Sequence, residues 1–205
     1  MKKFELTNEF ITNMFGTKLF RIRALVEFGD VEAGELGGYV EKESNLGHDD
    51  NAWVYGNARV YGDAQVSGDA RVYDNAWVYG DAQVSGDARV YGNARVYGNA
   101  WVYGNAWVYG NAWVYGNALV CSDEDYAYAH GFGSVNRTTT FFRLKDGGVG
   151  VRCGCFYGTL AQFRDKIRET HGETKKAQEY LMLADLMELR FEEDENEVGN
   201  RKYVE

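Results

Sequence analysis

A hexapeptide repeat occupies the middle of the chain. Valine recurs at every sixth position from Val54 to Val120, and alanine keeps the same period from Ala52 to Ala118. Asn or Asp precedes each of these alanines, and Gly precedes the Asn or Asp everywhere after Val54 except at Asp74. The unit Val-Tyr-Gly-Asn-Ala-x therefore occurs twelve times without a gap. Such a repeat constrains the fold strongly, because each unit must stack on its neighbours to bury its apolar face.

Each unit is typical of a short strand followed by a corner. The segment Ala-x-Val-Tyr alternates with period two, so Ala and Val face one side while x and Tyr face the other. Gly and Asn both tolerate a positive φ, which a tight corner needs. A narrow prism has room for small and β-branched side chains but not for Trp or Tyr. We therefore expect Ala and Val inside, and all the tryptophans and tyrosines of the repeat outside.

The number of units in one coil follows from a longer repeat. The segment Asp-Ala-Gln-Val-Ser-Gly-Asp-Ala-Arg-Val-Tyr occurs at residues 63–73 and again at 81–91, which is a shift of 18 residues or three units. A three-sided coil places these identical residues directly above one another. Twelve units then make four coils, which stack to about 19 Å at the usual spacing between strands. The predicted fold class is therefore mainly β, with a three-sided parallel β-helix.

The sequence before the repeat predicts an N-terminal cap over residues 1–48. Within it, alternating apolar and other residues at 20–26 predict one half-buried strand. Val40 and Leu46 lie six residues apart, so the coil can begin inside this segment. The β-helix itself is assigned to residues 49–121. Terminal units of a solenoid are usually atypical, because they must close the core.

Residues 122–205 predict a small α+β module. Strands are expected at 138–144 and 149–156, and the Asp-Gly-Gly segment at 146–148 between them is a hairpin signal. The second of these strands carries Cys153 and Cys155 on one apolar face. Two small buried thiols are the expected outcome there, because the C-x-C spacing lacks the second pair of a zinc motif.

Two helices are expected after these strands. The first begins at Thr159, which forms a capping-box pattern with Gln162, and ends before Gly172. The second carries apolar residues at helical spacing, namely Ala177, Tyr180, Leu181, Ala184 and Met187. The tail from Glu192 is acidic and is expected to fray. This module either caps the β-helix or recognises a partner.

The outward positions near the end of the repeat form an aromatic belt. Three consecutive units there carry tryptophan, and each tryptophan is followed two positions later by tyrosine. An exposed aromatic surface of this size usually marks an interface. The predicted partner-binding residues are Trp101, Tyr103, Trp107, Tyr109, Trp113 and Tyr115. The alternative is that stacked aromatic ladders, with arginine on tryptophan at about 0.5–1 kcal/mol for each exposed contact, only stabilise the coil.

Four motifs outside the repeat carry a resemblance to a known group of proteins. They are Phe20-Arg21-Ile22-Arg23-Ala24-Leu25, Leu36-Gly37-Gly38-Tyr39-Val40-Glu41, Asn136-Arg137-Thr138-Thr139-Thr140-Phe141-Phe142 and Cys153-Gly154-Cys155-Phe156-Tyr157-Gly158-Thr159-Leu160. With them, the chain resembles hexapeptide-repeat proteins of phages and prophages, some of which are labelled polymer-forming. The repeat itself resembles that of left-handed β-helix proteins, with an inward aliphatic residue and a small residue four positions later. The resemblance implies left-handed winding and a phage context, and it assigns no catalytic residue.

Composition and charge narrow the possible partners. The net charge of −9 argues against a nucleic-acid binder, since aspartates in the repeat offset its arginines and leave no basic groove. No stretch approaches 18 apolar residues, and the first residues lack the apolar core of a signal peptide, so neither a membrane span nor export is expected. Three cysteines fit a reducing compartment. The expected location is the cytoplasm of a bacterial host.

Acyl transfer is the main enzymatic alternative, because many hexapeptide β-helix proteins are acyltransferases with a histidine base. The histidines here are His48, His130 and His171, and none lies in the twelve units. A general base also needs an oriented neighbour and a cleft. An acyltransferase would therefore have to use His130 or His171 at a subunit interface, and no catalytic residue is predicted.

The sequence thus predicts a non-catalytic binding or assembly scaffold, and the resemblance implies that it is a phage or prophage protein. A host-directed inhibitor acting through protein–protein contact is one concrete version. The expected partners are further copies of the chain, a host protein, or both, with no cofactor and no metal. The alternatives are an acyltransferase with an inter-subunit site, and a small-ligand sponge with pockets between protomers or between coil and cap.

Overall fold

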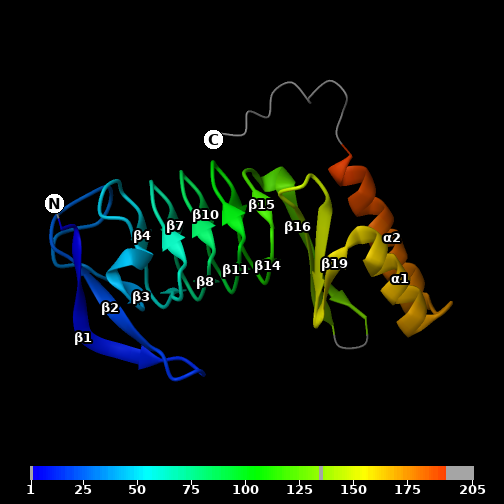
Figure 1. Ribbon diagram of the computed structural model, residues 1–205, viewed down its shortest axis with the longest axis horizontal. Coiled ribbons are helices and arrows are strands. Elements are labelled where there is room, and N and C mark those ends of the chain that lie inside the picture. Colours follow the sequence, from blue (N-terminus) through cyan, green and yellow to red (C-terminus); the bar gives the residue numbers. More distant parts are fainter. Residues whose placement is uncertain (1, 134–135, 193–205) are drawn as a thin grey trace.

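Three parts follow one another along the molecule, which we describe from a computed structural model covering residues 2–133 and 136–192. An N-terminal cap is followed by a parallel β-helix, and then by a C-terminal module of one antiparallel sheet and two helices (Figure 1). The predicted fold class, a mainly β chain with a parallel β-helix between a cap and an α+β module, is confirmed. The left-handed winding implied by the resemblance stays a prediction.

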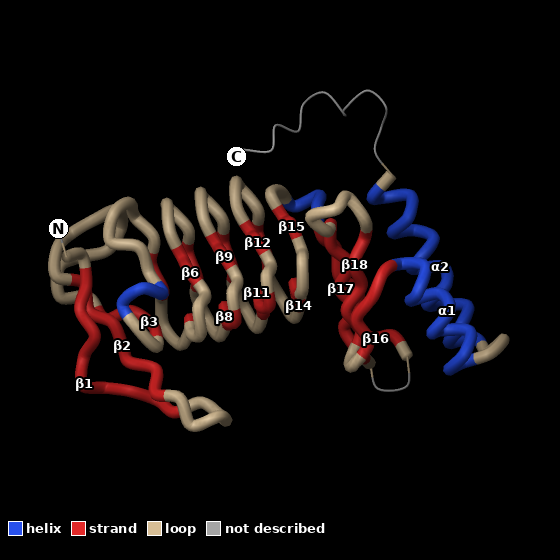
Figure 2. The backbone as a smooth tube through the Cα atoms, viewed as in Figure 1, coloured by secondary structure: helices blue, strands red, loops and turns tan. Residues whose placement is uncertain are grey.

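The twelve hexapeptides, all of them described, form twelve strands in three parallel stacks (Figure 2). The stacks are β4 (Trp53–Val54), β7 (Arg71–Val72), β10 (Arg89–Val90) and β13 (Trp107–Val108); β5 (Arg59–Val60), β8 (Trp77–Gly80), β11 (Arg95–Gly98) and β14 (Trp113–Tyr115); and β6 (Gln65–Val66), β9 (Gln83–Val84), β12 (Trp101–Val102) and β15 (Leu119–Val120). Paired residues are 18 apart, as in Val60↔Val78. The three-sided coil of 18 residues is therefore confirmed.

The β-helix begins earlier than the first of these units. Strand β3 (Leu36–Val40) pairs in parallel with β5 through Val40↔Val60, and Leu46 forms a parallel bridge with Val66. These two segments add a further turn to the four predicted coils. Val40 and Leu46, six residues apart in the sequence, thus occupy inward positions of that first turn, and both are buried.

The interior of the β-helix consists of the repeated alanines and valines. Every one of them from Ala52 to Val120 is at most 1% exposed. Full burial of one valine stabilises the fold by about 1.5–3 kcal/mol before the loss of chain entropy. The corners take the positive φ expected of Gly-Asn, for example +65° at Gly68. At the one corner without glycine, Asp74 adopts a φ of 60°.

The N-terminal cap is an antiparallel hairpin that extends one sheet of the β-helix. Strand β1 (Phe4–Thr12) pairs with β2 (Lys18–Ala24), and β2 pairs with β3. The strand predicted at 20–26 corresponds to β2, whereas β1 was not predicted. A short 3-10 helix, η1 (Glu43–Asn45), follows β3.

One prediction about the tryptophans needs correction. Trp53 occupies an outward position in register with Arg71, as expected, yet it is fully buried. The cap covers it, since the rings of Phe4 and Phe28 pack edge-on against the indole at centroid distances of 6.2 and 5.3 Å. Trp53 therefore joins the cap to the β-helix and is not part of an exposed surface.

The C-terminal module begins with a short 3-10 helix, η2 (Asp123–Asp125). A four-stranded antiparallel sheet follows, with strands β16 (Tyr126–Phe132), β17 (Arg137–Arg143), β18 (Val149–Cys153) and β19 (Phe156–Thr159). Two helices complete the module, α1 (Leu160–His171) and α2 (Lys175–Phe191). The capping box of α1 and the buried face of α2 are confirmed. Residues 193–205, which include most of the predicted acidic tail, lie outside the described part of the chain.

The strand predicted at 149–156 is in fact two strands with a tight turn between them. Strand β18 ends at Cys153, which pairs with Phe156, and Gly154 has a φ of +58° in the two-residue turn. Cys155 lies in that turn and is exposed, while Cys153 is half-buried. The expectation of two buried thiols on one strand face was therefore wrong.

Strand β17 separates two hydrophobic cores. Phe142 belongs to the core of the β-helix, which it closes at the C-terminal end. The adjacent Phe141 faces the other way, into a second core formed with α1 and α2. Neighbouring residues of a strand point to opposite faces, so one sheet serves both as the lid of the β-helix and as the floor beneath the helices.

The two ends of the β-helix leave different backbone groups free at many positions. Many hydrogen bonds between coils run from an N–H group to a carbonyl oxygen of the following coil, as when Trp53 N donates to Ala70 O. At these positions the first coil leaves carbonyl oxygens without a strand partner (the carbonyl end), and the last coil leaves N–H groups (the N–H end). Such edges must be satisfied when they are buried, and they attract other strands when they are exposed.

Side-chain donors satisfy the carbonyl end. Lys3 Nζ donates to Ala52 O at 2.9 Å, and Asn45 Nδ2 donates to Ala64 O at 2.8 Å. Both donor side chains are buried. Burial lowers the pKa of the Lys3 ammonium to about 8, because desolvation disfavours the charged form.

Side-chain acceptors satisfy the N–H end. Trp107 N donates to Asp123 Oδ1 at 2.7 Å, and Trp113 N donates to Thr140 Oγ1 at 3.0 Å. The chemistry of each cap thus matches the backbone groups that the coil leaves free there. The outer edge of the N-terminal sheet is the hairpin strand β1 and not a strand of the coil.

Candidate binding site at the C-terminal end of the β-helix

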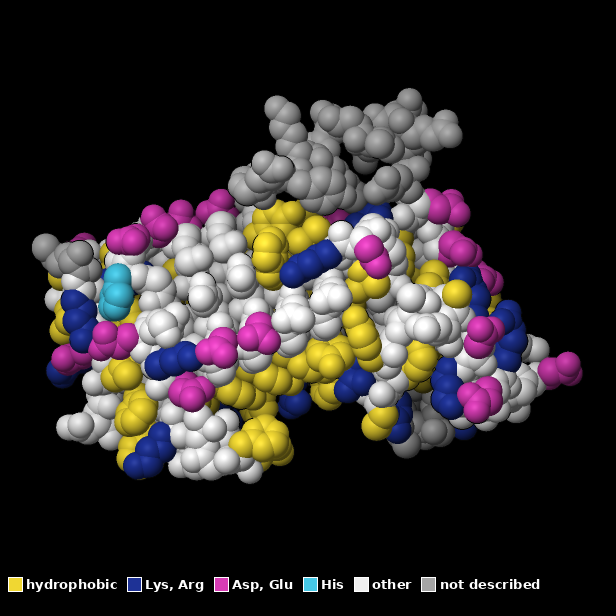
Figure 3. Space-filling model, viewed as in Figure 1, with side chains coloured by type: hydrophobic (Ala, Val, Ile, Leu, Met, Phe, Trp, Pro, Cys, Tyr) yellow, Lys and Arg dark blue, Asp and Glu magenta, His cyan; other side chains and the backbone are white. Residues whose placement is uncertain are grey.

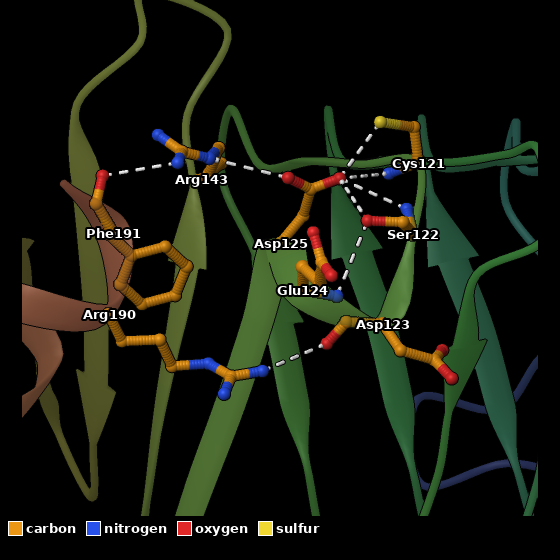
Figure 4. Close-up of polar contacts among 8 residues, drawn as sticks. All are labelled: Cys121, Ser122, Asp123, Glu124, Asp125, Arg143, Arg190 and Phe191. Carbon is orange, nitrogen blue, oxygen red and sulfur yellow. Dashed lines mark hydrogen bonds and ion pairs between the residues drawn. The ribbon is translucent and has the colours of Figure 1, made fainter. Parts of the chain in front are cut away.

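A buried polar network fixes the C-terminal module to the last coil (Figure 4). The Oδ2 atom of Asp125 accepts hydrogen bonds from Cys121 N and Ser122 N, each at 3.0 Å. Its Oδ1 atom forms an ion pair with Arg143 Nε at 3.3 Å. Arg143 Nη2 in turn donates to Phe191 O, at the end of α2, at 3.1 Å. The network therefore connects the coil, β17 and α2, and it holds the surfaces described below in fixed relative positions.

The six residues of the aromatic belt lie on all three faces of the β-helix. Trp101, Trp107 and Trp113 belong to three different sheets, those of β12, β13 and β14. Trp101, Trp107 and Tyr109 are 41%, 39% and 40% exposed. The other three residues of the belt are half-buried. The belt thus encircles the coil as expected, but it does not form one continuous surface.

Tyrosines on the outside of the coil stack on one another. Tyr79 lies between Tyr61 and Tyr97, with centroid distances of 5.0 and 4.7 Å and nearly parallel rings. The ladder continues to Tyr115, whose ring meets Tyr157 of the C-terminal module edge-on at 4.7 Å. Burial raises the pKa of Tyr79 above its ordinary value, because the ring stack excludes water from the phenol.

A second ladder alternates arginine with tryptophan on the same face. Arg95 lies between Trp77 and Trp113, with its guanidinium carbon 4.5 and 4.8 Å from the two ring centroids. Arg59 and Arg152 extend the alternation below Trp77 and above Trp113. Figure 3 shows hydrophobic side chains gathered in the lower part of the coils, over β8, β11 and β14. Most aromatic residues on this face of the β-helix thus stack on side chains of the neighbouring coils.

The end of this ladder opens into a cleft between the coil and the C-terminal sheet. It has a volume of about 410 Å³. Its lining residues are Asn93, Arg95, Asn111 and Trp113 from the coil, and His130, Asn136, Arg137, Thr138, Arg152 and Gly154 from the module. We call it the arginine cleft. It could not be predicted from the sequence, because its two walls come from segments with no shared period.

The histidines of the acyltransferase alternative lie apart from one another. His130 Nδ1 is 2.8 Å from Thr138 Oγ1 in the arginine cleft, and His171 stacks on Tyr180 at a centroid distance of 5.9 Å. His48 stacks on Phe4 in the N-terminal cap. Across residues 2–133 and 136–192, no histidine is hydrogen-bonded to a carboxylate that would orient it as a base.

The described residues show neither a metal-binding cluster nor a membrane-spanning helix. Within the described ranges, no group of three or more His, Cys, Asp or Glu side chains is arranged to hold a metal ion. Cys153 Sγ accepts a hydrogen bond from Thr139 Oγ1 at 3.2 Å, which is a structural contact at the edge of the second core. Neither described α-helix is long and apolar enough to cross a bilayer.

Sequence reasoning missed a second apolar face on α2. Its buried face holds the residues predicted from the sequence, but Met182, Leu186 and Leu189 project from the opposite face and are 71%, 55% and 67% exposed. We call these three residues the α2 stripe. Residues spaced by four and then three positions share one face of a helix. This second apolar face could have been recognised in the sequence, because a soluble helix with one packing partner should carry only one apolar face.

One family model matches part of the chain. It is described as YdcK Beta solenoid repeat, and it matches residues 52–64, 64–80, 82–98, 88–104, 94–110 and 100–116. All of these segments lie in the hexapeptide coils. No match was found among curated proteins. The chain is therefore a repeat β-helix protein, and its function must be argued from the surfaces that the repeat supports.

Proposed function

We propose that the protein is a non-catalytic binding scaffold that recognises a partner protein through the α2 stripe. The observation that carries the proposal is the exposure of Met182, Leu186 and Leu189 on one face of a helix whose other face is already packed. Apolar residues at i, i+4 and i+7 are the anchors with which a helix docks into an apolar groove. Soluble proteins seldom expose such a stripe without a partner.

Charge around the stripe indicates the chemistry of the partner. Asp185 and Glu188 are exposed beside it, with side chains that are 70% and 56% accessible. Both carboxylates contact Arg164 of α1, whose side chain is largely buried. The two carboxylates themselves remain open to solvent. Helix α2 also exposes Lys175 and Arg190, so the complementary partner has an apolar groove with charges of both signs at its rim, since matched charge guides encounter and fixes register.

The β-helix serves as the rigid support in this proposal. Both of its ends are closed by matched side chains such as Lys3 and Asp123, so assembly by end-to-end strand pairing is not the function we favour. The exposed members of the belt, Trp101, Trp107 and Tyr109, form a second proposed contact surface. Their mutual separation on different faces makes them weaker candidates than the α2 stripe.

The resemblance to phage and prophage proteins supplies the finer version of the proposal. The partner would then be a protein of the bacterial cytoplasm, and binding would inhibit it. The inter-subunit acyltransferase has no observation that favours it over a scaffold. Small-ligand binding does have one, the arginine cleft, which is a separate site from the α2 stripe.

The test is affinity capture from a bacterial host lysate with the parent and with Met182→Ser/Leu186→Ser/Leu189→Ser. We expect a host protein that the parent retains, that the triple variant loses, and that a synthetic peptide of residues 175–192 displaces. Circular dichroism of the variant should be unchanged, because the substituted side chains are exposed. Recovery of the same proteins by both forms, or of further copies of the chain alone, would contradict the proposal.

A further inference from the structure

The arginine cleft concentrates positive charge in a protein whose net charge is −9. Arg95, Arg137 and Arg152 line it, together with uncharged side chains and His130. No aspartate or glutamate is among the described residues that form its walls. Three guanidinium groups around one cleft repel one another, and this repulsion is relieved when an anion binds between them.

These three arginines differ from most others in the molecule. Arg71 pairs with Asp30 and Arg164 with Asp185, at distances of 2.8 and 2.9 Å. Arg95, Arg137 and Arg152 form no ion pair with any carboxylate of residues 2–133 and 136–192. Arg59 and Arg89 also have no ion pair in the described part of the chain, but each is stacked on a tryptophan away from the cleft, whereas the cleft brings three unpaired guanidinium groups to one place.

Stacking on tryptophan fixes the planes of two of the three guanidinium groups, and the third belongs to the exposed Arg137. Arg95 is held between two indole rings, and Arg152 stacks over Trp113 while its Nη1 donates to Phe156 O at 3.2 Å. Arg137 lies against Gly154, in the space that a Cβ at that position would occupy. Stacking engages the faces of a guanidinium and leaves N–H groups at its edge to bind an oxyanion.

Uncharged polar groups complete the walls. Asn93 and Asn111 lie at one corner of the coil, where Asn93 Nδ2 donates to Asn111 Oδ1 at 3.3 Å. Thr138 and Asn136 face them from the module. Such groups bind the uncharged hydroxyl or amide parts of a ligand, and a volume of about 410 Å³ suits a small metabolite and not a polymer segment.

We propose that the arginine cleft binds a small phosphorylated molecule. A phosphate ester carries a charge of about −1.5 to −2 at neutral pH, and its oxygens accept bidentate hydrogen bonds from arginine. One carboxylate would offset only one of the three guanidinium groups. Both walls are needed, since Arg95 comes from the coil while Arg137 and Arg152 come from the module. This site goes beyond the partner surface on α2 and does not depend on it.

Isothermal titration calorimetry at low ionic strength tests the proposal, with inorganic pyrophosphate as the probe and citrate as a carboxylate of similar charge. We expect saturable binding of pyrophosphate and a loss of affinity of about 10-fold or more in Arg95→Gln and in Arg137→Gln, since each removes charged hydrogen bonds. Arg152 is left unchanged, because its Nη1 also donates a hydrogen bond to Phe156 O within the module.

Arg59→Gln is the matched control. Arg59 occupies the same ladder and also stacks on Trp77, but it does not line the cleft. The Arg59→Gln variant should bind pyrophosphate with the same affinity as the parent. No saturable binding, citrate binding as tight as that of pyrophosphate, or an equal loss in Arg59→Gln would overturn the proposal. The triple variant of the α2 stripe should bind pyrophosphate normally, so failure of the partner proposal and failure of this one are distinguishable.

Discussion

The outward side chains of the β-helix and those of the C-terminal module differ in what they contact. On the β-helix, Arg95 is enclosed by Trp77 and Trp113, which occupy equivalent positions one coil away on either side. On α2, Met182 and Leu186 project from the face opposite the packed one. In a repeat, outward side chains pack against the equivalent side chains of the neighbouring coils. A module without a repeat has no equivalent side chains for its outward residues to pack against. Recognition is therefore expected from the module and support from the coil.

Their interiors differ in the same way. The β-helix core is a column of alanines and valines, each of which meets the same residue type one coil above and below. The core of the module is assembled from single large residues such as Phe141, Phe163 and Tyr180. Between the two cores, the sheet and the buried Asp125–Arg143 pair join the two parts, so damage to that pair should weaken their connection.

The largest effect on stability is expected from Asp125→Ala. The change leaves Arg143 buried without its carboxylate and leaves two N–H groups of the last coil without their acceptor. Breaking a buried ion pair on one side costs about 3–5 kcal/mol. Urea denaturation should show this loss, with the module unfolding before the coil. Asp123→Ala, which removes an exposed acceptor of one N–H group, should cost only about 1 kcal/mol.

A smaller loss is expected from Gly68→Ala in the coil. A Cβ there would lie 2.8 Å from Gly86 N of the next coil, and the φ of +65° disfavours any side chain. We expect a loss of about 2–4 kcal/mol from strain and overpacking together. Gly56→Ala has the same kind of φ but open space around the added carbon, so it should cost about 1–2 kcal/mol. Equal losses in thermal or urea unfolding would show that contact between coils does not matter at the corners.

A pH effect is expected at the N-terminal end of the coil. The folded protein releases the Lys3 proton at about pH 8, whereas the unfolded chain holds it to about pH 10.4. Between these values the unfolded state binds more protons, so the free energy of unfolding rises with pH. The rise from pH 8 to 9.5 should be about 1.5 kcal/mol larger in the parent than in Lys3→Met. Parallel pH profiles of the two proteins would show that Lys3 is not desolvated.

The coil could be predicted from the sequence because its contacts recur at one fixed separation. The identical segments at 63–73 and 81–91 set that separation, and every inward alanine and valine then follows. The burial of Trp53 could not be predicted in the same way. Its outward position was correct, but its exposure depends on Phe4 and Phe28, which approach it from a hairpin with no repeat.

The candidate sites depend on contacts between segments that share no period. Arg143 reaches Phe191 across 48 residues, and Lys3 reaches Ala52 across 49. No local pattern encodes such pairs, so the buried polar network around Asp125 and the arginine cleft were not predicted. The exposure of Cys155 was missed for a different reason. Gly154 could have been recognised as a turn residue, but the residues on either side of it favour a strand, so one continuous strand was predicted.

The central claim, that the module recognises the partner while the coil supports it, is tested most directly by comparing two variants in one capture experiment. One is Met182→Ser/Leu186→Ser/Leu189→Ser on α2, and the other is Trp101→Ser/Trp107→Ser on the belt. The α2 side chains are mostly exposed, so that variant should stay within about 0.5 kcal/mol of the parent per substitution. Trp101 and Trp107 stack with Lys145 and Arg89, so the belt variant should lose more, and circular dichroism must first show that it is folded. The account predicts that the α2 variant loses the host protein while the belt variant retains it. Loss by the belt variant alone would contradict the account and assign recognition to the coil.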